Sequence, residues 1–197
     1  DTMITLAIVT VSTLLAIVIG IPIGIMMARS DRAQSLVNPI LDVMQTLPSF
    51  VYLIPVVMVF GIGKVPGVIA VVIYAVPPMI RLTNLGIRLV DREVLEAADA
   101  FGSSPSQKLM NVQIPLALPT VMAGINQTIM MSLAMVVVAS MIGVGGLGKN
   151  VLQAISNQFL TIGFLNGFAL VAIAIIFDRT SQAYGKRLQR HTEVVHG

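Results

Sequence analysis

The chain has 197 residues, of which 56% are hydrophobic and only 11% are charged, and its formal net charge is +3. A soluble domain carries about 25% charged residues, so this composition excludes an ordinary water-facing surface and indicates that much of the surface faces lipid. There is no cysteine, and the two histidines, His191 and His196, stand near the C-terminal end. This excludes disulfides, thiolate chemistry and histidine metal ligands in the apolar part of the chain.

Five apolar stretches are predicted to cross the membrane as helices. In chain order they are Thr2 to Ala28, Ser35 to Phe60, Val65 to Ile80, Ile114 to Ile142 and Ile162 to Phe177. Together they predict a transmembrane domain over residues 1–178 and a polar cytoplasmic tail over residues 179–197. Because the sequence starts at an aspartate and not at a methionine, we expect an N-terminal portion to be missing.

Prolines are expected to shape two of these stretches, since proline removes a backbone donor and disfavours a helical residue before it. Pro48 and Pro55 interrupt the second stretch, and the pair Pro77-Pro78 is expected to end the third. In the first stretch, Gly20 and Gly24 form a small-x-x-x-small pair, which is typical of closely packed membrane helices.

Polar side chains inside the second and fourth stretches are candidates for lining a pathway through the membrane. In the second stretch their spacings of three, four and three residues predict a common helix face. Polar groups in a membrane span usually face the bundle interior or a water-filled pathway; the alternative is that they only form hydrogen bonds between helices. The candidates for a pathway are Asp42, Gln45, Ser49, Tyr52, Asn126 and Gln127.

The longest polar stretch lies between the third and fourth spans and predicts two short helices joined at a glycine, a compact knob. Asp91 is placed to cap a helix that ends near Ala100, and Gly102 permits a sharp turn. Ser104 and Gln107, with a proline between them, match the capping box of a second helix. We expect Pro115 to end this helix.

A glycine-rich stretch, residues 143–150, matches one nucleotide-binding motif and misses the phosphate loop by one residue. Both motifs require a preceding β-strand in a soluble domain, whereas here a membrane helix precedes. We therefore expect a flexible turn followed by an external helix from Val151 to Phe159.

The distribution of basic residues predicts the orientation. With five spans, ten of the twelve Lys and Arg residues fall on one side, and only Lys64 and Lys149 fall on the other. The positive-inside rule therefore places the N-terminus outside, and the knob and the C-terminal tail in the cytoplasm. Because the basic residues alternate with apolar stretches, the net charge does not indicate binding to nucleic acid.

The knob also carries a recognisable pattern. Glu96-Ala97-Ala98, then Gly102, then Val112-Gln113-Ile114-Pro115 resembles the cytoplasmic motif of permease subunits in ATP-binding-cassette importers. Four further stretches, residues 41–55, 77–83, 122–130 and 139–143, are similar to the glycine betaine/proline betaine permeases of that family.

The resemblance implies an all-α integral membrane protein with the five-helix core of a type I importer permease and cytoplasmic coupling helices in a loop at about residues 82–114. It implies that residues of this loop couple the permease to an ATPase, namely Glu96, Ala97, Ala98, Gly102, Ser104, Gln107, Val112, Ile114 and Pro115.

The resemblance also implies the assembly and its place. The partners would be a second permease copy, two cytoplasmic ATPases and an external substrate-binding protein. The chain would lie in a bacterial or archaeal cell membrane as a multi-pass protein, would hold no cofactor, and would not itself be an enzyme, since a partner binds and hydrolyses ATP. The implied substrates are glycine betaine and proline betaine.

Other functions stay open at this point. Within the same family the substrate could be histidine, proline or another amino acid, or choline or carnitine. A channel is possible from the apolar pattern alone, and ATP-dependence of uptake would separate it from an importer. An intramembrane enzyme is disfavoured, since no predicted span contains a histidine.

The orientation can be tested by labelling. Cysteines introduced singly at Ser104 and Lys149 are expected to react with a membrane-impermeant maleimide from opposite sides of the membrane, because the two positions lie in loops on opposite sides. Labelling of both positions from the same side would contradict the predicted topology.

Overall fold

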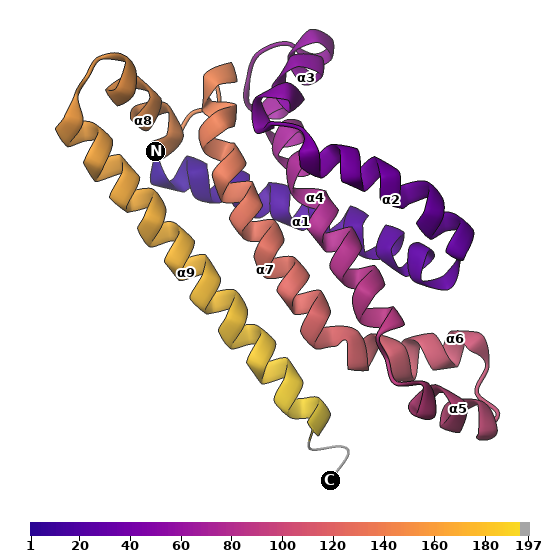
Figure 1. The fold of residues 1–197 in the computed structure, drawn as a ribbon. Coiled ribbons are helices and arrows are strands. Elements are labelled where there is room, and N and C mark those ends of the chain that lie inside the picture. The colour runs from indigo at the N-terminus through magenta and orange to yellow at the C-terminus, as the bar shows by residue number, and fades with distance from the viewer. Residues whose placement is uncertain (194–197) are drawn as a thin grey trace.

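The computed structural model describes residues 1–193, and the regular structure in this part of the chain is helical (Figure 1). In chain order the elements are α1 (Thr2–Arg29), α2 (Asp31–Thr46), a 3-10 turn (Ser49–Tyr52), α3 (Leu53–Phe60), α4 (Lys64–Arg88), α5 (Arg92–Ala100), α6 (Pro105–Lys108), a widened π-helical turn (Leu109–Gln113), α7 (Ile114–Ala139), a second 3-10 turn (Ser140–Ile142), α8 (Leu147–Ser156) and α9 (Leu160–Glu193).

Four helical stretches in the described residues are long and apolar enough to cross a bilayer: Thr2–Arg29, Lys64–Arg88, Pro105–Ile142 and Leu160–Gly185. A fifth crossing results if α2 and the segment Ser49–Phe60, which are bent by 113° relative to each other, are taken together. The five predicted apolar segments are therefore all helical, but the second is a bent pair instead of one straight span.

The bend occurs at Pro48. The residue before this proline, Leu47, is extended, with φ −71° and ψ 133°, as expected where the proline ring crowds the preceding backbone. Pro55, the other proline in this stretch, lies in the first turn of α3, where an amide donor is not needed. The break therefore belongs to Pro48 alone.

The third span is longer than the sequence predicted. α4 continues through Pro77 and Pro78, both buried, and ends only at Arg88. Proline is tolerated inside membrane helices where neighbouring helices support the chain, and α1 and α7 pack along α4 on this part of its length. The expected end at the proline pair is wrong, and Arg81 belongs to the helix and not to a loop.

α4 is the central helix, because α1 and α7 both pack directly on it (Figure 1). Glycines permit the close approach. A Cβ added at Gly20 of α1 would lie 2.7 Å from Met79 Cγ, and one added at Gly24 would lie 2.6 Å from Thr83 Cβ. On the other side of α4, Gly124 of α7 faces Leu82 and Met79. The predicted packing role of Gly20 and Gly24 is confirmed.

α6 and α7 follow one another through a widened turn. The expected end of the second knob helix at Pro115 is wrong, because helix continues from Pro105 to Ile142. The π-helical turn Leu109–Gln113 lies immediately before Pro115, and the Ile114 amide donates to the carbonyl of Leu109, five residues back. A widened turn relieves the clash between a proline ring and the preceding helical turn.

The glycine-rich stretch is a packed connection instead of a flexible turn. The Gly63 amide donates to the Ile142 carbonyl at 2.9 Å, and the Leu147 amide donates to Thr5 Oγ1 at 3.0 Å. A Cβ at Gly146, which has φ +105°, would lie 2.5 Å from the same Thr5 oxygen. α8 begins at Leu147, earlier than predicted, and lies beside the start of α1.

The last helix, α9, passes the predicted end of its span at Phe177 and reaches Glu193. Most of the predicted polar tail is thus a helical extension of the span, while residues 194–197 of that tail lie outside the described residues. Few residues in the apolar part of α9 are buried within the chain, so this helix presents most of its surface outward.

The α1–α4 contact can be tested by adding one methyl group. Gly24→Ala is expected to destabilise the protein by about 1–3 kcal/mol, the usual cost of overpacking, because the new Cβ would meet Thr83 and the Ile80 carbonyl at 2.8 Å. Thermal unfolding in detergent, followed by circular dichroism, measures the change. Gly167→Ala in α9, where nothing lies within 4 Å, is the matched control, and equal stability of the two variants would contradict the contact.

Candidate functional site

The first helix of the knob (residues 89–113) is closed at both ends by local hydrogen bonds. The Glu93 amide donates to Asp91 Oδ1 at 3.0 Å, which confirms the predicted cap. At the other end Gly102 has φ +76°, its amide donates to the Asp99 carbonyl at 2.9 Å, and the Ser103 amide donates to the Ala98 carbonyl at 3.0 Å. This pair of bonds is a Schellman motif, which needs a left-handed residue where Gly102 stands.

The second knob helix begins with the predicted capping box. The Gln107 amide donates to Ser104 Oγ at 3.3 Å, and the Ser104 amide donates to Gln107 Oε1 at 2.9 Å. Sequence reasoning missed the ion pair between Lys108 and Asp99, in which Nζ lies 2.6 Å from Oδ1 and 2.8 Å from Oδ2. This pair joins α5 to α6, and because its members are nine residues apart across a turn, no periodicity indicates it.

Ala97 and Ala98 were both expected to couple the knob to a partner, but only Ala97 lies on its surface. Glu96 and Ala97 are exposed, but Ala98 is buried, so only the first of the two alanines can meet a partner. Phe101 is 91% exposed, and Leu89 and Met110 are exposed as well. An exposed phenylalanine at the tip of a polar loop is a candidate anchor for a partner, and sequence reasoning did not single it out.

The remaining predicted knob residues attach it to the membrane helices. Val112 in the widened turn and Ile114 and Pro115 at the start of α7 are all half-buried. Ile114 packs against a small apolar cluster of Ile87 and two further side chains, Leu109 and Ala117. These positions therefore hold the knob against the end of α4, and they do not present a free surface.

The four polar residues of the second stretch do not share one helix face. Asp42 and Gln45 are exposed on α2, whereas Ser49 and Tyr52 follow the 113° bend. The predicted common face is wrong, because the helical spacing was carried across Pro48. Tyr52 is buried, its hydroxyl donates to the Met44 carbonyl, and its ring lies edge-on to Tyr74 with centroids 5.5 Å apart.

Two ion pairs connect α2 to α4. Asp42 pairs with Arg81, and Asp31 pairs with Arg88 at 2.7 Å. Arg88 has two further partners, since it donates to the Met27 carbonyl at 3.0 Å and to Asn84 Oδ1 at 3.2 Å. Arg81 was predicted to lie in a loop, so its pairing with a candidate pathway residue was not anticipated.

The two polar candidates in the fourth stretch, Asn126 and Gln127, lie in different environments: one is bonded to α9 and the other is exposed. Asn126 Nδ2 donates to Asp178 Oδ1 at 2.9 Å, and the Ser181 hydroxyl donates to Asn126 Oδ1 at 2.7 Å. Gln182 also donates to Asp178, at 2.7 Å. Asn126 therefore joins α7 to α9, as the alternative of interhelical bonding predicts, while the neighbouring Gln127 is exposed. The pathway role of both stays a prediction.

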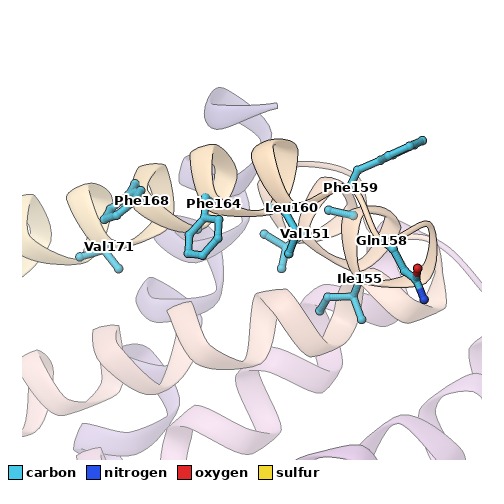
Figure 2. Close-up of a pocket in the computed structure, with 11 residues that line it drawn as sticks. Val151, Ile155, Gln158, Phe159, Leu160, Phe164, Phe168 and Val171 are labelled. Atoms are coloured by element: carbon cyan, nitrogen blue, oxygen red, sulfur yellow. The ribbon is translucent and has the colours of Figure 1, made fainter.

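A pocket of about 850 Å³ lies between α8 and the first part of α9 (Figure 2). Its lining is apolar apart from Gln158, with Phe164 and Phe168 stacked along α9. None of the predicted site residues lines it. Among the described residues there is also no group of three or more His, Cys, Asp or Glu side chains that could hold a metal ion.

Comparison with known proteins agrees with this geometry. Residues 20–190 match the model of the family described as binding-protein-dependent transport system inner membrane component. The chain is 54% identical to the glycine betaine/proline betaine transport system permease protein ProW of Escherichia coli over 93% of its own length and 52% of the relative. It is 57% identical to the glycine betaine/carnitine transport permease protein GbuB of Listeria monocytogenes, over 93% of the chain and 65% of the relative.

The chain thus spans between half and two thirds of the length of these curated relatives. A solved structure of the MetNI methionine ABC transporter in an inward-facing conformation has the same fold. Its TM-score is 0.86 at 20% identity, over 95% of this chain and 94% of that one. The five-helix core of a type I importer permease is therefore the fold of this protein.

The α7–α9 contact can be tested at Asn126. Asn126→Ala is expected to lower the free energy of unfolding by about 1 kcal/mol, a typical value for interhelical hydrogen bonds in membranes, because Asp178 and Ser181 each lose a partner. Thermal unfolding in detergent measures the loss, and Gln127→Ala, at the exposed neighbour, is the control. A stability loss no greater than that of the control would show that the cluster does not hold α9.

Proposed function

The chain belongs to the family of binding-protein-dependent transport system inner membrane components. From this premise we propose that it is the membrane-spanning permease subunit of an ATP-driven importer, and that the importer carries glycine betaine/proline betaine-type osmoprotectants. The observation that carries the proposal is the identity of more than half of the aligned residues with two permeases that are both named for glycine betaine. Because the alignments cover 93% of the chain, they include the knob and most of the apolar helices.

Carnitine is the second candidate substrate, because the GbuB relative is named for both glycine betaine and carnitine. Both compounds carry a quaternary ammonium and a carboxylate. An amino acid is less well supported, since the methionine transporter shares only the fold at 20% identity. We therefore assign the substrate class as zwitterionic quaternary amines.

The proposed assembly contains two permease copies, two cytoplasmic ATPases and an external binding protein. The family description itself names dependence on a binding protein. The glycine-rich stretch supports the assignment of ATP to a partner, because its Leu147 amide and Gly146 are packed against Thr5 of α1 and are not arranged around a phosphate. Energy then has to enter the permease through a contact with the ATPase.

The proposed orientation places Asp1, the α8 end of the molecule and Lys149 outside the cell, and the knob and the end of α9 in the cytoplasm. The bent pair of α2 and α3 then counts as one crossing, which gives five. The knob and the C-terminal end of α9 lie at the same end of the molecule in Figure 1, and Asp1 lies at the other end beside α8, so the arrangement supports the basic-residue asymmetry.

In the proposed mechanism the ATPases close on ATP, draw the two knobs together and open the pathway outward. A transmitting element has to be rigid, since a floppy loop would absorb the motion. The Schellman motif, the capping box and the ion pair between Asp99 and Lys108 stiffen the knob. Glu96, Ala97 and Phe101 are exposed on it and form the proposed docking surface, with Phe101 as its apolar anchor.

The coupling role can be tested by changing the knob without disturbing the membrane helices. Glu96→Lys and Gly102→Asp are expected to leave the permease folded and inserted but to reduce co-purification of the ATPase and its stimulation by loaded binding protein. Glu96→Lys reverses a charge on the docking surface. Gly102→Asp places a side chain at φ +76°, which costs about 1–2 kcal/mol.

Gly61→Asp is the matched control for the glycine variant. Gly61 has the same φ of +76° and, like Gly102, nothing within 4 Å of an added Cβ. Its ψ of −161° is essentially restricted to glycine, so the control adds backbone strain as well, but at the opposite end of α4 from the knob. We expect this control to retain the ATPase. Wild-type co-purification and stimulation in both knob variants would show that the loop is only a connector.

A further inference from the structure

The Asp42–Arg81 ion pair lies on the membrane part of the molecule and is open on one side. Arg81 is seven residues before the end of α4, about 10 Å along the helix axis. Its side chain is 37% exposed, and that of Asp42 is 65% exposed. Exposed charges at this depth are unfavourable against acyl chains, and charged residues in spans normally face a water-filled pathway or another protein surface. The exposure of this pair is therefore compatible with a position at the pathway or at the contact with a second copy.

Arg81 also has a donor left over. Its Nε is buried and, in the part of the chain that the structure describes, is one of three buried side-chain polar atoms without a hydrogen-bond partner. A buried donor without an acceptor is unfavourable. An oxygen ligand on the exposed side of the guanidinium could accept from its Nη groups, and it would reach the buried Nε only if the side chain turned as the Asp42 pair opened.

The second ion pair between the same two helices is also exposed, at 32% for Arg88 and 91% for Asp31, but its arginine has a partner at Nε. Arg88 donates from Nε to Asn84 and from Nη2 to both Asp31 and the Met27 carbonyl. Its hydrogen-bonding capacity is used to tie α4 to α1 and α2. Of these two α2–α4 ion pairs, the Arg88 pair has an Nε with a hydrogen-bond partner, and the Arg81 pair has an Nε without one.

We propose that Arg81 and Asp42 form a transient binding subsite for the zwitterionic substrate on the translocation pathway. The inference rests on the proposed function, and it adds a ligand class and a residue, Arg81, to the pathway. The substrate carboxylate accepts hydrogen bonds from the Arg81 guanidinium, and the quaternary ammonium, which has no N–H, lies against the Asp42 carboxylate by charge alone.

The exchange is balanced in charge. The protein pair and the zwitterion are each neutral overall, so one ion pair opens and two form, with no net charge added to the membrane interior. Such a site holds a zwitterion in one orientation but binds it weakly, because the protein pair re-forms when the substrate leaves. A weak site suits a pathway from which the substrate must depart.

The aromatic pair nearby is a poorer site for the ammonium group. Tyr74 is seven residues before Arg81 on α4, again about 10 Å away, which is beyond the length of a small betaine bound at Arg81. The Tyr52 ring is buried against Tyr74, and its hydroxyl is bonded to the Met44 carbonyl. An aromatic cage that encloses a quaternary ammonium needs open ring faces, so Asp42 is the better partner.

The test compares two isosteric neutralisations on α2 in the complete reconstituted importer. ATP-driven uptake of labelled glycine betaine into proteoliposomes is measured together with ATP hydrolysis. Asp42→Asn is expected to assemble, to keep ATPase stimulation by loaded binding protein, and to lower uptake per ATP about tenfold, the factor that corresponds to roughly 1.4 kcal/mol. Asp31→Asn removes the acid of the other α2–α4 pair and is expected to stay within about twofold of wild type, since an exposed ion pair contributes little.

Arg81→Lys is the second variant. It keeps the positive charge beside Asp42 but removes Nε and the planar fork, and we expect normal assembly with uptake per ATP reduced severalfold. Wild-type uptake per ATP in Asp42→Asn or in Arg81→Lys, or equal losses in Asp42→Asn and Asp31→Asn, would overturn the subsite. Absence of ATP-driven betaine uptake by the wild-type importer would instead overturn the proposed function, and the subsite with it.

Discussion

The close approach of α1 and α7 to α4 is the constraint on which the rest of the molecule depends. Within a bilayer, association of helices relies on packing and on hydrogen bonds instead of the hydrophobic effect, so small residues at the contact decide how near two backbones can come. Gly20 and Gly24 supply this on one side of α4, and Gly124 supplies it on the other. This packing supports α4 through its proline pair, and the knob and the arm formed by α2 are both attached to this helix.

The knob is fastened to two membrane helices at once. It leaves α4 through three residues after Arg88 and returns into α7 through the widened turn before Pro115. The cluster around Ile87, Leu109 and Ala117 fills the angle between these connections. A displacement of the knob must therefore move the ends of both α4 and α7, and these two helices pack extensively on each other. Local stiffness and direct attachment to the central helix α4 together make the knob suited to transmit a displacement to the membrane helices.

Sequence reasoning was accurate for features that near neighbours in the chain determine, and it failed for features that depend on contacts between distant helices. The first span was predicted to within one residue, and the capping box at Ser104 and the turn at Gly102 were confirmed, because neighbours within a few positions determine them. The proline pair was read as a helix end, but burial between two helices outweighed its local preference. The partners of Asn126 stand 52 and 55 residues away, so no spacing rule could have indicated them.

The polar groups of the membrane region differ in how many of their donors and acceptors have partners, and they therefore differ in how they hold the helices together. The cluster of Asn126, Asp178 and Ser181 fixes α9 to α7, and rearranging it would break several bonds at once. α2 is held to α1 and α4 by one apolar cluster that includes Leu41, and by the two ion pairs. At one end of α2, Arg88 bonds to Asp31, Asn84 and the Met27 carbonyl. At the other end, Arg81 bonds to Asp42, and its buried Nε has no partner among the described residues. The proposed subsite thus lies at the end of α2 where the arginine has fewer protein partners.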